Sequence, residues 1–172
     1  MKKNVEKFGI SDKRGREQTN LDPFVPGKGL KDPSLCKHCH NYFHDNRWSN
    51  DTQAYEQLKE RTDVHWVVCP SCRKAREGVV EGVLTLRGSY LWKHENEIRR
   101  LLENEKDKMT ARNPLERIVR MEREEDQLIV ETTEKRLVEQ LGRALQRAHR
   151  GEFDIQWSGC PEVCRVSWER TL

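Results

Sequence analysis

The sequence predicts an α+β protein in which a small cysteine-rich module is followed by a larger domain of strands and helices. Three observations predict this architecture. Two Cys-x-x-Cys pairs, at residues 36–39 and 69–72, are separated by residues 40–68. From about residue 77 onward, apolar residues alternate with period two in some segments and recur with helical spacing in others. The first 33 residues show neither pattern.

Composition limits the size of the core. Hydrophobic residues make up 34% of the 172 residues and charged residues 35%, whereas a globular domain has an apolar share of about 45–50%. The net charge of +3 is mildly basic and does not by itself define a nucleic-acid binder. No apolar run approaches the ~20 residues that span a bilayer, and no apolar segment follows the N-terminal lysines as in a secretory signal. We therefore expect a cytoplasmic protein without a membrane partner.

Residues 1–33 are expected to form an extended basic tail, because glycines and prolines interrupt every periodicity. The tail is either an idle terminus or a basic arm that becomes ordered on RNA. Its candidate RNA-binding residues are Lys13, Arg14 and Arg16.

Residues 34–76 are predicted to form a zinc ribbon. Cys36, Cys39, Cys69 and Cys72 can bring four thiolates to the corners of a tetrahedron, which is the geometry of a closed structural Zn²⁺ site. The neighbouring histidines 38, 40 and 44 are interpreted as bystanders, because four cysteines complete the site. The Cys-x-x-Cys-His pattern of haem attachment is disfavoured, since it leaves the second cysteine pair unexplained.

Several residues of this module have both a structural and a functional interpretation. Residues 49–51 can cap a short helix with Ala54, Tyr55 and Leu58 on one side. Trp48 and Trp66 are expected to cover the metal module, and stacking on a nucleobase is the alternative. The cations that follow the second cysteine pair are either solvated or form a phosphate-contacting patch; they are Arg73, Lys74 and Arg76.

Residues 77–172 are predicted to form a ferredoxin-like (split βαβ) domain with an extra C-terminal strand. Apolar alternation predicts strands at 80–87, 118–121, 128–130, 153–157 and 164–168. Helical spacing predicts helices at 90–108 and from Thr132 or Thr133 to Gly151. The resulting order β-α-β-β-α-β, plus one strand folded back by a hairpin, is the basis of the assignment.

Two further clusters lie in this domain. Arg143, Arg147 and Arg150 share one face of the second helix, where they either complement the helix dipole or contact an RNA backbone. Cys160 and Cys164 are interpreted as free thiols, with redox pairing or an incomplete metal site as alternatives.

The stretch from C-P-S-C-R-K through V-V-E-G-V-L-T-L-R-G to L-I-V-E-T-T-E-K-R-L-V-E-Q-L resembles the nuclear export adaptor family of the large ribosomal subunit in eukaryotes and archaea. The resemblance covers roughly residues 65–158. It implies a ribosomal or rRNA surface and supports the four cysteines as metal ligands. This sequence offers one complete cysteine set where that family has enough for two metals, and we do not transfer the export function.

We therefore expect a non-enzymatic zinc-ribbon protein that binds ribosomal RNA or a ribosomal subunit. It would act in translation through ribosome assembly, dormancy (hibernation) or the handling of stalled ribosomes. No motif for nucleotide hydrolysis, metalloprotease or serine hydrolase chemistry is present, and no small-molecule substrate is evident. The alternatives are a protein-interaction or regulatory module that senses zinc or redox state and, less favoured, a DNA-binding regulator, since no helix carries a cluster suited to the major groove.

Overall fold

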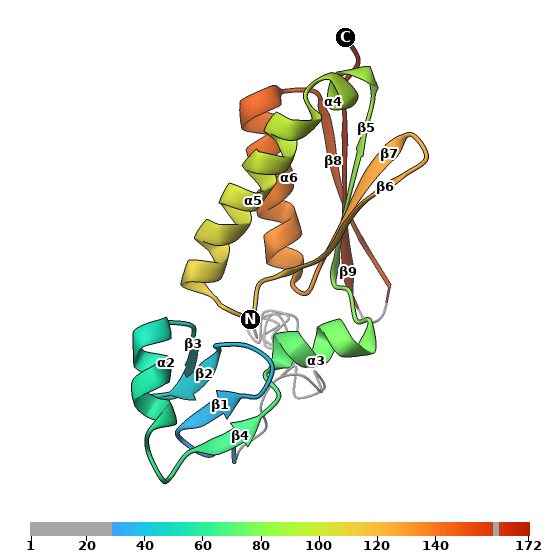
Figure 1. Ribbon diagram of the computed structural model, residues 1–172. Coiled ribbons are helices and arrows are strands. Elements are labelled where there is room, and N and C mark those ends of the chain that lie inside the picture. The colour runs from blue at the N-terminus through green and yellow to red at the C-terminus, as the bar shows by residue number, and fades with distance from the viewer. Residues whose placement is uncertain (1–28, 160–161) are drawn as a thin grey trace, which may run out of the picture. The chain divides into compact units, whose positions relative to one another are not determined.

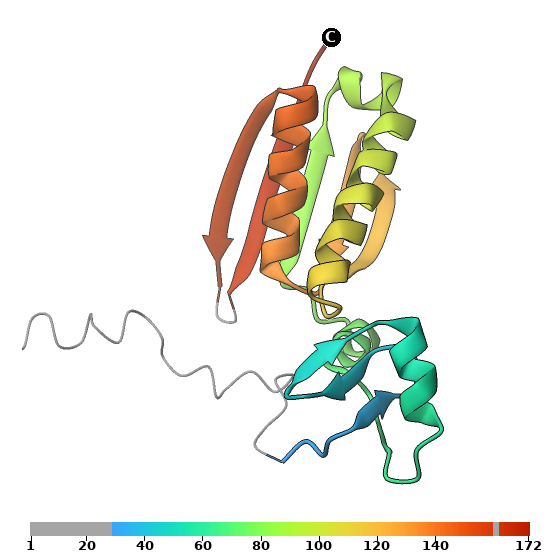
Figure 2. The ribbon, with the colours of Figure 1, turned by 90° about the vertical axis from the view of Figure 1, so that its left-hand side faces the viewer.

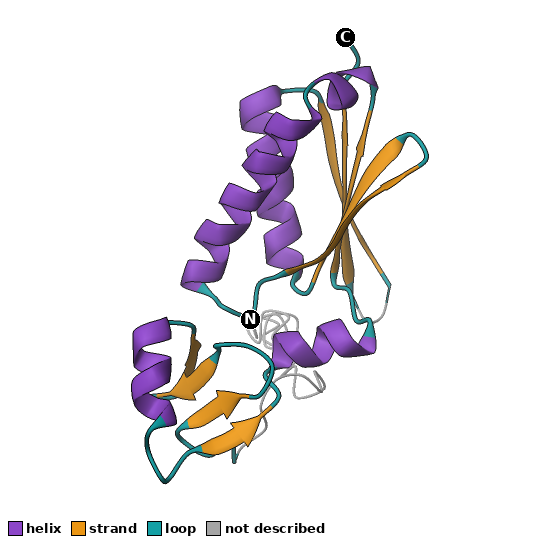
Figure 3. Ribbon diagram, in the orientation of Figure 1, coloured by secondary structure: helices purple, strands orange, loops and turns teal. Residues whose placement is uncertain are grey.

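The computed structural model describes residues 29–159 and 162–172, and Lys31–Leu172 form one compact unit. This unit is mixed α/β, and its described part contains two mixed sheets and five helices (Figures 1 and 3). Most of the predicted tail, including Lys13, Arg14 and Arg16, lies outside the described residues. None of the helices within the described ranges is both long and apolar enough to span a bilayer.

The first sheet carries the first cysteine pair and has the strand order β3-β2-β1-β4. Its strands are β1 (Ser34–Cys36), β2 (Tyr42–His44), β3 (Arg47–Ser49) and β4 (His65–Val67). Strand β4 runs parallel to β1, and the other neighbours are antiparallel. Every strand has only three residues, so this sheet buries little apolar area on its own.

Helix α2 (Thr52–Lys59) supplies the small apolar cluster of the module. Asp51 caps it as predicted: its Oδ1 accepts a hydrogen bond of 2.7 Å from the Ala54 amide. Tyr55 and Leu58 are buried, and they pack with Leu35 of the sheet. Four buried side chains, the fourth being Tyr42, make up this cluster. An apolar cluster of this size is small for an independently folded module.

Helix α3 (Pro70–Glu77) follows edge strand β4 of the first sheet, and the second cysteine pair lies at its start. Cys69 is its N-cap, and Pro70 occupies the first turn, where the missing amide of proline costs nothing. Gly78 ends the helix in the left-handed region at φ 67°. The second Cys-x-x-Cys pair therefore spans the N-cap and first turn of a helix. The residues that follow Cys72 continue this helix, so some of them face the protein interior and others face solvent.

The second sheet has the strand order β6-β7-β5-β9-β8. Its strands are β5 (Gly82–Arg87), β6 (Ile118–Glu124), β7 (Gln127–Thr132), β8 (Glu152–Ser158) and β9 (Val163–Glu169). All five lie at or near the predicted positions. The last strand is inserted between β5 and β8, and it runs parallel to β5 and antiparallel to β8. The extra strand is thus an inner strand of the sheet, and alternate residues of it are buried in the core.

Two long helices cover one face of this sheet, α5 (Glu95–Arg112) and α6 (Lys135–His149), as Figure 2 shows. The main core lies between helices and sheet, with Leu84, Leu141 and Trp168 among its fully buried members. Helix α5 ends before Pro114, as the sequence predicts. Alternate strand residues face this core, in agreement with the predicted period of two.

Two helix boundaries differ from the prediction. The helix expected at 90–108 is divided into α4 (Ser89–Lys93) and α5, with His94 between them at φ −117° and its ring stacked on Tyr90 at 4.1 Å. The helix expected from Thr132 or Thr133 begins at Lys135. Thr133 is held in the extended chain instead, because its amide donates to the Arg117 carbonyl and its hydroxyl to the Leu115 carbonyl.

Candidate metal centre and its surroundings

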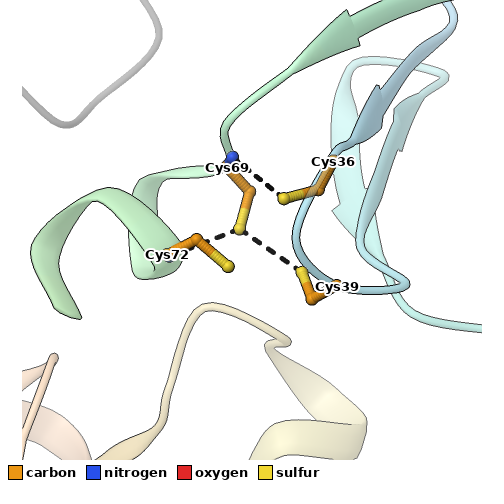
Figure 4. A group of neighbouring side chains, drawn as sticks. All are labelled: Cys36, Cys39, Cys69 and Cys72. Atoms are coloured by element: carbon orange, nitrogen blue, oxygen red, sulfur yellow. Dashed lines mark hydrogen bonds between the residues drawn. The ribbon is translucent and has the colours of Figure 1, made fainter. Parts of the chain in front are cut away.

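The four predicted cysteines converge on one point (Figure 4). Cys36 ends β1 and Cys39 lies in the following turn, while Cys69 and Cys72 come from the start of α3. All four sulfur atoms lie within 4.8 Å of one another. Cys36, Cys69 and Cys72 are buried, and Cys39 is partly exposed. The cluster can therefore hold a metal ion away from most of the solvent.

Their spacing fits a tetrahedral ion. The Cys39 and Cys69 sulfur atoms are 3.7 Å apart. A tetrahedron with metal–sulfur bonds of about 2.3 Å has edges of about 3.8 Å, whereas a disulfide requires about 2.05 Å. The donor set and the measured edge thus agree with a four-thiolate metal centre.

Backbone amides point at the sulfurs and can stabilise their negative charge. Cys36 Sγ accepts from the amides of His38 at 3.4 Å and Cys69 at 3.3 Å. The Asn41 amide donates to Cys39 Sγ at 3.4 Å, and the Cys72 amide to Cys69 Sγ at 3.5 Å. Three of these donors lie two or three residues after the cysteine they contact, whereas the Cys69 amide reaches Cys36 from the start of α3.

The thiols influence one another electrostatically. Hydrogen bonds from Cys39 and Cys69 lower the pKa of the Cys36 thiol, while the pKa of Cys39 is raised by its bond to Cys36. Burial, followed by the charge on Cys69, raises the pKa of Cys72 to about 11. Ionising one sulfur therefore opposes ionisation of its neighbours, and a cation at the centre removes that opposition.

The loop between α5 and β6 also contacts the cluster, which the sequence did not predict. Arg117 donates from Nη1 to Cys72 Sγ at 3.5 Å. Burial lowers the pKa of Arg117, but the nearby Cys39, Cys72 and Cys69 more than compensate and raise it above its ordinary value. Asn41 donates from Nδ2 to both Cys69 Sγ, at 3.6 Å, and the Pro114 carbonyl, at 3.1 Å. Two polar side chains thus join the cysteines to the larger sheet domain.

The three histidines near the first pair are not part of this group of ligand atoms. His38 and His40 are exposed, and the His40 ring lies edge-on to Tyr55 at 5.1 Å. The His44 ring pairs with Asp32 at 2.6 Å instead. This placement agrees with their interpretation as bystanders.

The two tryptophans have different surroundings. Trp48 is partly buried and packs against the cysteine cluster, as predicted. Its Nε1 is buried without a hydrogen-bond partner among the described residues. Trp66, in contrast, is 46% exposed on β4, so the prediction that it covers the metal module is wrong.

The three cations predicted to form a basic patch after Cys72 lie on different faces of α3. Arg73 and Arg76 are exposed, and they line an open hollow of about 480 Å³ with Val67, Val68 and Glu77. Lys74 faces inward and is only 2% exposed. Its Nζ lies 2.7 Å from carboxylate oxygens of both Glu81 and Glu134. Lys74 is therefore not placed to contact a phosphate, and the predicted patch is corrected to Arg73 and Arg76.

The predicted patch on α6 is exposed, but its three members do not share one helix face as expected. Arg150 lies beyond the end of α6 at His149, with φ 56°. Arg143 pairs with Glu139 at 2.7 Å. Arg147 and Arg150 are exposed and have no ion pair with any described residue. Arg147 lies 13 residues after Glu134, or about 20 Å along the helix axis. The α6 cations are thus a separate patch from those of α3.

Cys164 is fully buried in the main core, and burial raises the pKa of its thiol. Cys160 lies outside the described residues.

Neither a family model, nor a curated protein, nor a solved structure matches this chain. The function is therefore inferred from the chain's own residues and their geometry.

Proposed function

We propose that this protein is a non-enzymatic zinc-binding protein that docks on ribosomal RNA. In this proposal residues 34–76 are a zinc ribbon and residues 77–172 a ferredoxin-like domain with one inserted strand. The zinc fixes the shape of the cysteine module, and the module presents cations to the RNA backbone. The family resemblance implies the ribosomal surface, and we place the protein in the cytoplasm, in ribosome assembly, dormancy or the handling of stalled ribosomes.

The chemistry of the donor set supports zinc and argues against catalysis. Four thiolates in a tetrahedral arrangement are ligands that zinc prefers. Cys36, Cys39, Cys69 and Cys72 would occupy all four positions and leave none for water or substrate. A closed centre of this kind supplies folding energy and no activated water.

The observation that carries the proposal is the hollow beside α3. Arg73 and Arg76 are three residues apart, so they lie on the same face of the helix. They border an apolar floor formed by Val67 and Val68, directly before Cys69. Guanidinium groups next to an apolar surface suit a nucleic-acid backbone, since they pair with phosphates while the apolar floor can receive a sugar or base.

The patch on α6 offers a second contact. Arg147 lies about 20 Å along the helix axis from Glu134, which pairs with Lys74 of α3, and Arg150 follows the end of the helix. Phosphates on one RNA strand are several ångströms apart, so a strand of several nucleotides is long enough to span that distance.

The redox alternative is less well supported. A redox-sensing cysteine needs exposure and thiolate character, whereas Cys164 is buried and the pKa of its thiol is raised. The described part of the chain thus offers no exposed reactive thiol at this position.

Co-sedimentation with ribosomes tests the proposal. Tagged protein in a cell lysate is run on sucrose gradients at low and moderate salt, alongside the variant Arg73→Glu/Arg76→Glu. The control Lys93→Glu/Arg100→Glu makes the same change in net charge at exposed positions on α4 and α5. We expect wild type and control to sediment with a ribosomal subunit and the α3 variant to be released, with binding that weakens log-linearly with salt. Wild-type protein that stays at the top of both gradients contradicts the proposal.

A further inference from the structure

A second hollow borders the cysteine module on the side of the β2–β3 hairpin. It has a volume of about 390 Å³ and is lined by that hairpin, the start of α2 and the C-terminal end of α5 with the following loop. Arg47, Trp48, Asn50 and Arg112 contribute to its wall. The volume is within the range of small-molecule and cofactor pockets, about 300–1,000 Å³. We call this hollow the Trp48 cleft.

The charges of the cleft favour an anion. Arg47 and Arg112 are exposed, and neither forms an ion pair within the described ranges of the chain. The carboxylate in the lining, Asp51, is already engaged, because its Oδ1 accepts from the Ala54 amide at 2.7 Å. Two guanidinium groups thus remain for a phosphate.

The aromatic wall of the cleft favours a ligand with a planar ring. Trp48 contacts the cysteine cluster and lies 5.7 Å from the Phe43 ring in a tilted arrangement, and it also lines the cleft. These contacts fix the indole in place, so little side-chain entropy is lost when a base stacks on it. Its Nε1 has no acceptor among the described residues, and a buried donor left unpaired is costly.

Asn50 adds a polar group suited to a base edge. Its Nδ2 reaches the Thr110 carbonyl at 3.5 Å, which holds the amide at the cleft wall. The amide oxygen has no partner in the part of the chain that the structure describes. Side-chain amides commonly read the edges of unpaired bases.

We propose that the Trp48 cleft binds one nucleotide of a single-stranded RNA segment, with the phosphate between Arg47 and Arg112 and the base against Trp48. This inference rests on the proposed function and names the form of RNA that the module recognises. Single-stranded rRNA loops present splayed bases, whereas a duplex keeps its bases stacked and out of reach of the indole.

Fluorescence anisotropy with a labelled single-stranded 12-mer RNA tests the cleft, using the full-length protein with its metal bound. The variants are Arg47→Ala/Arg112→Ala and Trp48→Phe, and the control is Lys93→Ala/Arg100→Ala, which removes the same charge from exposed positions outside the cleft. We expect the double arginine variant to weaken binding about tenfold and to lower the salt slope by about 0.7, the value for one phosphate on a single strand. Trp48→Phe keeps a ring against the cysteines and should weaken binding several-fold with an unchanged slope. Metal content and thermal melting establish that each variant is folded.

The outcomes separate this inference from the proposed function. Binding that depends on Arg73 and Arg76 but is unchanged in both cleft variants overturns the cleft and leaves RNA binding in place. If the cleft variants lose the same binding affinity for an RNA duplex as for the single strand, the cleft contacts phosphate without a base. That result also overturns the proposal for the Trp48 cleft. Absence of binding by the wild-type protein to this RNA and to ribosomes overturns both proposals.

Discussion

Arg117 gives the sharpest test of how the metal centre is built. Its guanidinium Nη1 lies 3.5 Å from Cys72 Sγ and donates a hydrogen bond to it. Four thiolates with a divalent ion carry a net charge of −2, so a cation at this position stabilises the loaded cluster more than the protonated, metal-free one. Coulomb attraction between unit charges at 3.5 Å is about 5 kcal/mol at an effective dielectric constant of about 20, which is an upper bound.

Solvent and the residual charge of the metal-free cluster reduce this figure. Loss of a partner of a metal ligand typically weakens metal affinity by about 10–100-fold, equivalent to about 1.4–2.7 kcal/mol. We therefore expect Arg117→Gln to weaken zinc affinity by about that factor. Arg117→Lys, which keeps the charge, should lose less.

Competition with a chromophoric zinc chelator measures these affinities. Arg120→Gln is the matched control, because Arg120 lies three residues further along and pairs with Glu131 at 3.0 Å instead of with a cysteine. Zinc affinity of Arg117→Gln equal to that of the Arg120 variant would refute the assigned electrostatic role. An equal loss in Arg117→Lys and Arg117→Gln would show that position and shape matter and charge does not.

Three further predictions concern stability. Cys69→Ser should abolish stoichiometric metal and unfold residues 34–77, because Cys69 is both a ligand and the N-cap of α3; elemental analysis and hydrogen exchange check this, and retained metal would contradict it. Lys74→Met should lower the free energy of unfolding, measured by urea denaturation, by about 2–3 kcal/mol. This is below the usual cost of breaking a buried ion pair, because the Glu81 and Glu134 side chains are 21% and 27% exposed. An unchanged urea midpoint would show that these ion pairs contribute nothing to stability. Glu116→Gln should stabilise the protein at neutral pH. Burial raises the pKa of the Glu116 carboxyl above its ordinary value, so its ionisation costs stability as pH rises from the unfolded-state pKa past the raised folded-state pKa. The gain should vanish in urea titrations below about pH 4, where the carboxyl is protonated in both states.

Most secondary-structure elements and the ligand set could be predicted from local sequence. Strands of the larger sheet alternate with period two because one face meets the helices, and that alternation is visible in the letters alone. The cysteine spacing likewise predicts the cluster, because a Cys-x-x-Cys turn places two sulfurs side by side whatever surrounds it. The cap at Asp51 is a similar local effect.

The remaining features depend on distant residues. Lys74 is buried because its partners are 7 and 60 residues away, and no local pattern distinguishes it from its exposed neighbours Arg73 and Arg76. Arg117 contacts Cys72 across 45 residues. The position of β9 between β5 and β8 likewise depends on tertiary packing. A strand at the edge and a strand inside the sheet show the same alternation of apolar and polar residues, so the sequence does not distinguish them.

The positions of the cations suggest why a closed metal centre would serve an RNA-binding surface. Val68 precedes Cys69 directly, and Arg73 follows Cys72 directly, so the ligands fix the geometry of the α3 hollow. Trp48 packs on the same cysteines, and the loop that begins after Arg112 continues to the contact of Arg117 with Cys72. The two hollows thus share one anchor. In a module whose own apolar cluster has four buried side chains, a bound ion is the element best able to hold both sets of cations at a fixed separation.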